Sequence, residues 1–276
     1  MLTLTFDQRL PTQLPRTLPV YAVAAPISPM RDIEAIAHSW PDLTLARAKV
    51  RRIGEWVSAD YGQLRLIYQQ VSGAVQARVT TAGTRVANTR FPLDDARVVE
   101  IARAFLTKFS LVDDEVSKLA LGEVTHLRRQ VASSDGIGSP EILDAGIFFT
   151  RVIDETPIAG PGGHVMVKVL PNRAIAGASR VFRPRGHKVG TVHIMAAGDA
   201  LTEFERRLRR NRNLDEPVRV LRAEFGYFEG GRSYRQRFFE PVYAFLFATE
   251  GEAPLKSVEI VQASGSNRGQ PGATYF

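Results

Sequence analysis

The stretch Ile147–Pro184, IFFTRVIDETPIAGPGGHVMVKVLPNRAIAGASRVFRP, decides the fold that we expect for this chain. It contains three short runs of β-branched and aromatic residues, at 147–153, 164–170 and 174–182. Clusters of Gly, Pro and Asn separate the runs, a pattern typical of an antiparallel meander. In the middle run the alternate valines from Val165 to Val169 share one face of a strand. We therefore expect this valine face to lie against the core.

Composition excludes several classes of protein. Of the 276 residues 44% are hydrophobic and 24% are charged, which is usual for a globular protein. No run of about 18 apolar residues occurs, so no membrane span is predicted. The N-terminus does not resemble a signal peptide, and localisation stays open, with the cytoplasm as the default. The absence of cysteine excludes disulfides, thiolate catalysis and cysteine-ligated metals.

Three helices with apolar stripes are expected, each followed by strands. Their apolar positions are Ile33, Ile36, Ala37 and Trp40; Val98, Ile101, Ala102, Phe105 and Phe109; and Ala197, Leu201, Phe204 and Leu208. The sequence thus predicts an α+β fold of repeated units, each a helix on an antiparallel sheet. The predicted units are 18–90, 91–185 and 186–263, and the polar tail 264–276 is expected to be disordered. In the second unit we expect Phe105 to pack on the valine face.

The second unit resembles a known family over about residues 91–184. The motifs are the helix DDARVVEIARAFL (Asp94–Leu106) and the segment from Val152 to Arg183, with turns at Asp154–Gly160 and Asn172–Gly177. Together they resemble a PepSY-type domain and its relative, the fungalysin/thermolysin propeptide (FTP) domain. This resemblance implies a cystatin-like shape, with one helix across a curved antiparallel sheet. It also implies roles in protease inhibition, propeptide chaperoning or extracytoplasmic binding.

Catalytic motifs do not occur in the sequence. HExxH, GxSxG, GxxxxGK[ST] and a GxGxxG fingerprint are all missing. Asp154, Glu155 and Glu240 qualify for general acid/base work by residue type alone, and nothing in the sequence brings two of them together. We predict no catalytic residue and no cofactor.

Two His-x-Met tripeptides are the weak metal candidates: His164 with Met166, and His193 with Met195. On a strand each pair shares one face, so two such strands side by side would offer two imidazoles and two thioethers, a set that suits Cu(I). The alternative is that the methionines fill gaps in the packing. We favour this alternative and predict no bound metal.

Aromatic residues are concentrated between 225 and 247, where arginines interleave with them. This composition is typical of binding surfaces, while packing inside a sheet is the other interpretation. The candidate binding residues are Tyr227, Arg232, Tyr234, Arg235 and Phe239. The glycines at 230 and 231 would let a hairpin tip present Arg232 and Tyr234. A protein partner or self-association is expected; nucleic acid is disfavoured, because the aromatics alternate with aliphatic residues.

The function predicted from the sequence is that of a non-catalytic binding or scaffolding protein, such as an inhibitor or a subunit of an assembly. The alternative is a small-molecule enzyme whose cavity lies between a helix and a curved sheet. A closed, polar-lined cavity in the second or third unit would favour the enzyme, since a scaffold does not need one.

Overall fold

The computed structural model describes residues 4–26, 29–40, 43–80, 91–108, 118–130, 132–133, 136–212, 217–249 and 256–264. The helices in this part of the chain are α1 (Pro29–Ser39), α2 (Asp95–Lys108) and α3 (Ala197–Arg212). No helix within these ranges is long and apolar enough to cross a lipid bilayer. The tail that was predicted to be disordered lies, beyond Ser264, outside the described residues.

One mixed sheet of 13 strands forms the body of the molecule. Its strands are β1 (Leu4–Phe6), β3 (Lys49–Ile53), β4 (Trp56–Asp60), β5 (Leu64–Gln69), β6 (Ala74–Val79), β7 (Leu119–Arg129), β10 (Glu141–Ile153), β11 (Thr156–Ala159), β12 (His164–Val169), β13 (Ile175–Val181), β15 (Val218–Phe228), β17 (Pro241–Thr249) and β18 (Lys256–Gln262). Their order is β18-β17-β15-β11-β10-β12-β13-β6-β5-β4-β3, with β1 beside β15 and β7 beside β10.

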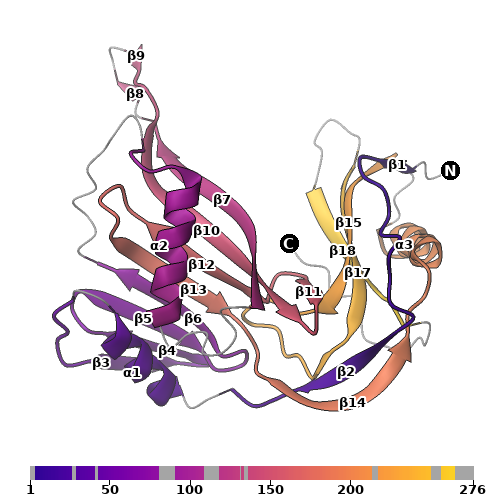
Figure 1. The fold of residues 1–276 in the computed structure, drawn as a ribbon, viewed down its shortest axis with the longest axis horizontal. Coiled ribbons are helices and arrows are strands. Elements are labelled where there is room, and N and C mark those ends of the chain that lie inside the picture. The colour runs from indigo at the N-terminus through magenta and orange to yellow at the C-terminus, as the bar shows by residue number, and fades with distance from the viewer. Residues whose placement is uncertain are drawn as a thin grey trace.

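Two smaller sheets complete the fold. Strands β2 (Thr17–Val23), β14 (Arg185–His193) and β16 (Phe238–Phe239) form a ribbon along the base of the molecule (Figure 1). Strands β8 (Ala132–Ser133) and β9 (Gly136–Ile137) form a small hairpin that extends beyond the ends of β7 and β10.

The predicted fold class, a series of α+β helix-on-sheet units, is wrong. The structure is mostly β: of the described residues, 52% are in strands and 18% are in helices. A strand edge carries unpaired backbone N–H and C=O groups, and here the edges of the predicted units pair with one another. Strand β6 pairs with β13, β11 pairs with β15, and β2 pairs with β14. Each of these pairs joins strands from two different predicted units. The sheet is also mixed, because β1 and β11 run parallel to β15.

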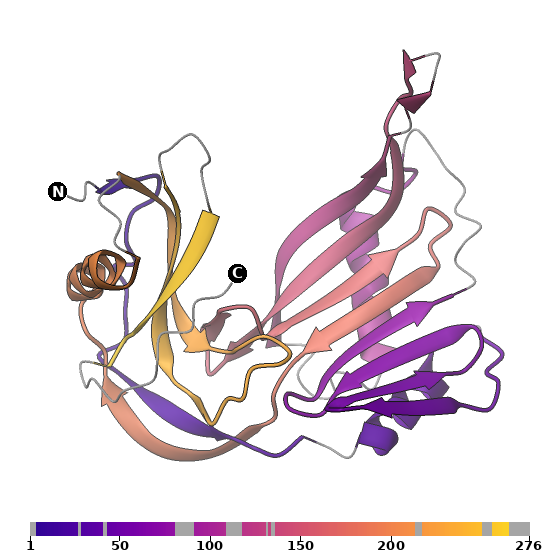
Figure 2. The ribbon, with the colours of Figure 1, turned by 180° about the vertical axis from the view of Figure 1, so that it is seen from behind.

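The predicted meander and its valine face are confirmed. Strands β10, β12 and β13 pair antiparallel in that order. The three alternate valines of β12 are fully buried in one core cluster with residues of α1 and α2, and Phe105 of α2 is 6% exposed in the same cluster. Helices α1 and α2 therefore cover one face of this half of the sheet (Figure 1). We call this half of the sheet, together with its two helices, the first lobe. Figure 2 shows the opposite, helix-free face, which we call the open face.

A second lobe has its own core. It consists of β1, β15, β17 and β18 with α3 packed on them. Phe204 of α3 stacks on Phe245 of β17, with ring centroids 4.6 Å apart. The short strand β11 joins the lobes, because it pairs with β10 on one side and with β15 on the other.

Candidate ligand-binding groove on the open face

Strand alternation places a set of polar side chains on the open face. The valines of β12 point to the helices, so Met166 and Lys168 point the other way. Residues paired in register share a face, and Gly177 of β13 pairs with both Lys168 of β12 and Arg78 of β6. The next row is Met166, Ser179 and Gln76. The strands that bury the valine face therefore also build this polar surface.

Glycine separates the two cations of the first row. A Cβ atom on Gly177 would lie 2.7 Å from the carbonyl oxygen of Ala77, so the position does not accommodate a side chain without a shift of the backbone. Adjacent strands are about 4.8 Å apart, which puts the backbones of Arg78 and Lys168 about 10 Å apart across this glycine. The result is a notch between an arginine and a lysine.

The notch belongs to a groove of about 520 Å³. The groove contains residues from five strands: Gln76, Arg78, Arg129, Asp144, Met166, Lys168 and Ser179 are among them. Arg129 is paired with Glu141 at 2.7 Å. Within the described ranges, neither Arg78 nor Lys168 has a carboxylate partner. The groove therefore presents two cations that are available to an anion.

Among the described residues that line the groove, Asp144 is the one acidic residue. It lies on β10, it is 2% exposed, and its Oδ2 atom has no hydrogen-bond partner among the described residues. Nearly all buried polar atoms in proteins are hydrogen-bonded, because a buried unsatisfied acceptor costs about 1–3 kcal/mol. This carboxylate is therefore a buried, unsatisfied hydrogen-bond acceptor in the lining of a cationic groove.

The tip of the β15–β16 connection, Glu229–Arg235, reaches the edge of the same face. We call this segment the hairpin tip. Its half-buried Arg232 donates a hydrogen bond from Nη1 to Oε1 of Gln76, at 3.1 Å, and burial lowers the pKa of the Arg232 guanidinium. His164 lies nearby: burial is the main cause of its lowered pKa, and Arg232 lowers it further. Arg232 thus adds a further cation at the rim of the groove, besides Arg78, Lys168 and the paired Arg129.

Two buried charged residues hold the hairpin tip in place. Arg183 donates from its guanidinium to the carbonyl oxygens of Gly230, Gly231 and Tyr234, at 2.5, 2.7 and 2.6 Å. The carboxylate of Glu229 accepts a hydrogen bond from the backbone N–H of Arg183 at 2.6 Å. Arg183 and Glu229 are 1% and 0% exposed, so this is a fixed internal contact between the lobes rather than a ligand site.

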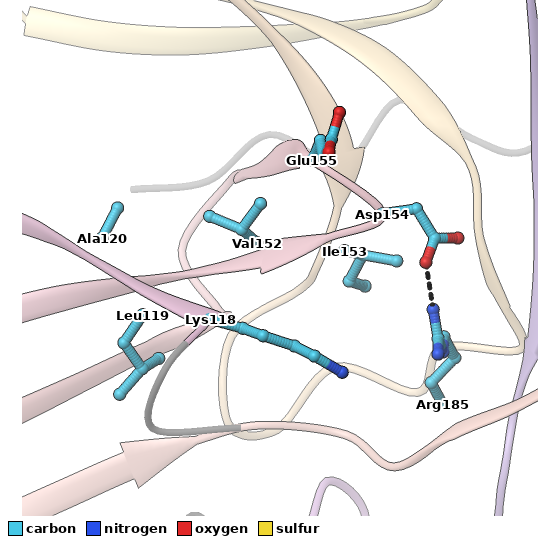
Figure 3. A pocket seen from close by; sticks show the side chains of 8 residues that line it. All are labelled: Lys118, Leu119, Ala120, Val152, Ile153, Asp154, Glu155 and Arg185. Atoms are coloured by element: carbon cyan, nitrogen blue, oxygen red, sulfur yellow. Dashed lines mark hydrogen bonds and ion pairs between the residues drawn. The ribbon is translucent and has the colours of Figure 1, made fainter. Parts of the chain in front are cut away.

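A second pocket, of about 440 Å³, lies where β10 turns into β11. Asp154 at this turn pairs with Arg185 at 2.8 Å and accepts a hydrogen bond from the Tyr21 hydroxyl. These contacts, the Tyr21 hydrogen bond foremost, hold the pKa of Asp154 below its usual value. Lys118 points toward Arg185, and Glu155 points away from both (Figure 3). The carboxylate here already has its partners, so this pocket is the weaker candidate.

The acidic residues that qualified for catalysis by type are not brought together into an acid/base pair. Asp154 and Glu155 are neighbours in a tight turn, with φ angles of 45° and 63°. Such left-handed angles at two consecutive residues are those of a type I′ hairpin turn. The two side chains point away from each other (Figure 3). Glu240 lies elsewhere, with its Oε2 atom 3.5 Å from Nε2 of Gln262.

The five predicted binding residues divide into two groups. Tyr227 and Phe239 are fully buried in a small core cluster, and the Tyr227 hydroxyl donates to the carbonyl of Pro19 at 2.8 Å. Arg232, Tyr234 and Arg235 lie on the hairpin tip. Tyr234 packs edge-on against Phe228, and the exposed Arg235 pairs with Glu55 of the first lobe. Their part in binding stays a prediction.

The predicted metal candidates lie in separate sheets. His164 and Met166 are on β12 of the large sheet, whereas His193 is on β14 and Met195 follows that strand. The two strands are not neighbours, so the four side chains do not form one ligand set. No group of three or more potential metal-ligating residues occurs in the described part of the chain.

The charged groove residues Arg78, Asp144 and Lys168 were not singled out by the sequence. Lys168 lies in a strand of valines, and Asp144 lies in an apolar run. Charged residues are rarely buried without a partner, so each of these two charges could have indicated a functional site. Arg78 lies in the same row as Lys168 because β6 pairs with β13, and these two strands are about 100 residues apart in the chain.

Comparison with known proteins gives similarity of structure only. No protein-family model matches the chain, and no curated protein matches it. The crystal structure of an uncharacterized protein from Eubacterium rectale ATCC 33656 is similar, with a TM-score of 0.61 and 10% sequence identity, over 99% of this chain and 91% of that one. This likeness shows that the two proteins share a fold. The resemblance of residues 91–184 to PepSY-type domains stays a prediction.

Proposed function

We propose that this protein is a non-catalytic binding protein and that its open-face groove holds an anionic group between Arg78 and Lys168. The observation that carries the proposal is the pair of cations on either side of Gly177, without carboxylate partners among the described residues. Hydrogen bonds between charged groups are roughly twice as strong as neutral ones. A carboxylate or phosphate in the notch would make such bonds to both side chains.

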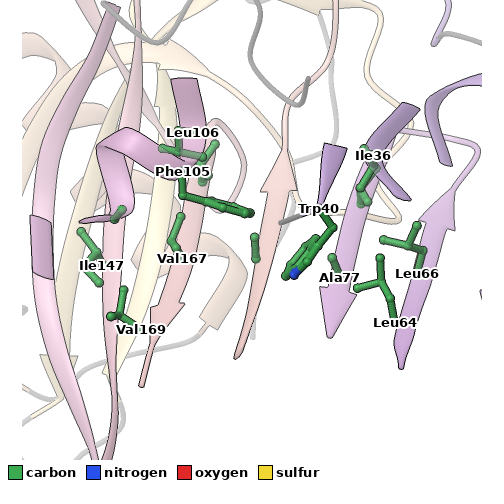
Figure 4. Packing of buried hydrophobic residues seen from close by; sticks show 14 of the residues in the cluster. Ile36, Trp40, Leu64, Leu66, Ala77, Phe105, Leu106, Ile147, Val167 and Val169 are labelled. Carbon is green, nitrogen blue, oxygen red and sulfur yellow. The ribbon is translucent and has the colours of Figure 1, made fainter. Parts of the chain in front are cut away.

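The open position of the groove agrees with binding rather than with enclosure of a reaction. The enzyme alternative places its cavity between a helix and the curved sheet. In the first lobe this interface is filled by buried side chains, including Trp40, Phe105 and Val167 (Figure 4). The rings of Trp40 and Phe105 meet edge to face, with centroids 5.2 Å apart.

Calorimetric titration with citrate and with tripolyphosphate, at low ionic strength, tests the proposal. We expect binding that weakens as salt is added, because salt screens exposed charges. The variant Arg78→Ala/Lys168→Ala should bind at least tenfold more weakly. The matched control is Arg209→Ala/Arg210→Ala, which removes the same charge from the exposed end of α3.

Two results would overturn the proposal. One is that neither anion binds the unaltered protein. The other is an equal loss of affinity in both double variants, which would mean that the anions respond to net charge and not to the groove.

A further inference from the structure

We infer that the ligand of the open-face groove is an extended acidic peptide with a free amino terminus, whose ammonium group binds Asp144. This inference rests on the proposed function, since it uses the same groove. It adds the chemical class of the ligand and a third contact. An anionic ligand alone would not explain why the unpartnered carboxylate of Asp144 lies in this groove.

The carboxylate of Asp144 requires a donor. It is almost fully buried, it lines the groove, and its Oδ2 atom is unpartnered within the described ranges. An anionic ligand without a donor would be repelled by this group. A ligand with an ammonium group would instead form a charge-assisted hydrogen bond and remove the cost of the unsatisfied acceptor. The groove therefore favours a ligand with a cation at one end and anions further along.

Register sets the spacing of these contacts. Asp144 lies two residues before Gly146 on the same face of β10, and Gly146 pairs with Lys168. With about 3.3 Å per residue along a strand and about 4.8 Å between strands, the backbones of Asp144 and Lys168 are about 8 Å apart. Arg78 is two strands further, about 16 Å from Asp144.

A peptide fits this spacing better than a compact anion does. An extended chain advances about 3.3 Å per residue, so five or six residues span the distance from Asp144 to Arg78. Acidic side chains near the third and the fifth or sixth positions would reach Lys168 and Arg78. The side-chain amide of Gln76 and the Arg232 guanidinium at the rim are further hydrogen-bonding groups for such a chain.

The test compares two probes on the full chain: hexaglutamate amide with a free amino terminus, and the same peptide with an acetylated amino terminus. We expect the free form to bind the unaltered protein at least tenfold more tightly. In Asp144→Asn this preference should fall to less than threefold, while Arg78→Ala/Lys168→Ala should weaken both peptides at least tenfold. The preference should also shrink from pH 7 to pH 9.5, because an α-amino group titrates near pH 8.

Three outcomes would overturn the inference. The first is equal binding of the two peptides to the unaltered protein, a comparison that needs no variant and so does not depend on whether Asp144→Asn folds. The second is absence of peptide binding while citrate and tripolyphosphate still bind, which leaves the proposed function in place. The third is tighter binding of a single-stranded oligonucleotide of the same charge, which would point to nucleic acid instead.

Discussion

At the scale of single residues, the buried charged side chains are of two kinds: some are paired with each other inside the protein, and one has no partner among the described residues. Arg151, Arg183 and Glu229 are all at most 3% exposed, and they form one network between the lobes. Arg151 donates to the carbonyl of Arg183 at 2.8 Å and lies over the ring of Phe182. Asp144 is equally buried, yet it forms no ion pair with any of the described residues, and its Oδ2 atom has no hydrogen-bond partner among them. The first set is therefore structural, whereas Asp144 points to a ligand.

Replacement of Glu229 by Gln tests the structural set. The change keeps the shape of the side chain but leaves two buried arginines without their carboxylate. We expect the free energy of unfolding to fall by about 3–5 kcal/mol, as is typical when one partner of a buried ion pair is removed. Urea denaturation measures this loss. The control is Glu100→Gln, which breaks the exposed pair with Arg97 and should cost less than about 1 kcal/mol. Equal effects of the two changes would contradict a structural role for Glu229.

At the scale of elements, the sequence predicted those features that depend on periodicity within one segment. The meander, the valine face and the three helices are confirmed, because alternation along a strand and the spacing of a helical stripe are local properties. The pairings of β6 with β13 and of β11 with β15 depend on which distant edges meet, and no local pattern specifies that. The groove was missed for the same reason. Lys168 was visible as a charge among valines, but its neighbour Arg78 comes from a strand about 100 residues earlier.

The packing of α2 on the sheet gives the element-scale prediction. Phe105 is 6% exposed, it meets Trp40 edge to face, and it shares a core cluster with the valines of β12. Phe105→Ala should lower the free energy of unfolding by roughly 3 kcal/mol or more, because the loss of buried apolar surface and the cavity left behind add together. The exposed Thr107 on the same helix provides the control, and Thr107→Ala should change stability by less than about 0.5 kcal/mol. A loss below about 1 kcal/mol for Phe105→Ala would mean that α2 does not pack on the sheet through this ring.

At the scale of the whole molecule, one short strand connects the strands of the two lobes into a single sheet. Strand β11 has only four residues, yet it pairs with β10 of the first lobe and with β15 of the second. The hairpin tip makes the second connection, through Arg183 on one side and through Gln76 and Glu55 on the other. The position of Arg232 at the rim of the groove therefore depends on how the two lobes are joined.

Gly226 is the position where this junction is tightest. A Cβ atom on Gly226 would lie 2.3 Å from the carbonyl oxygen of Pro157, a backbone atom that cannot move without shifting β11. We expect Gly226→Ala to separate β11 from β15 and to convert one unfolding transition into two, since each lobe has its own core. Differential scanning calorimetry measures the transitions, and small-angle X-ray scattering should show an increased radius of gyration. The control is Gly198→Ala at the start of α3, where the added Cβ atom meets nothing within 4 Å, so unfolding should remain a single transition. A single, unshifted transition in Gly226→Ala would show that the two lobes do not depend on this contact. In that case the hairpin tip and its buried arginine, rather than β11, would hold the lobes together.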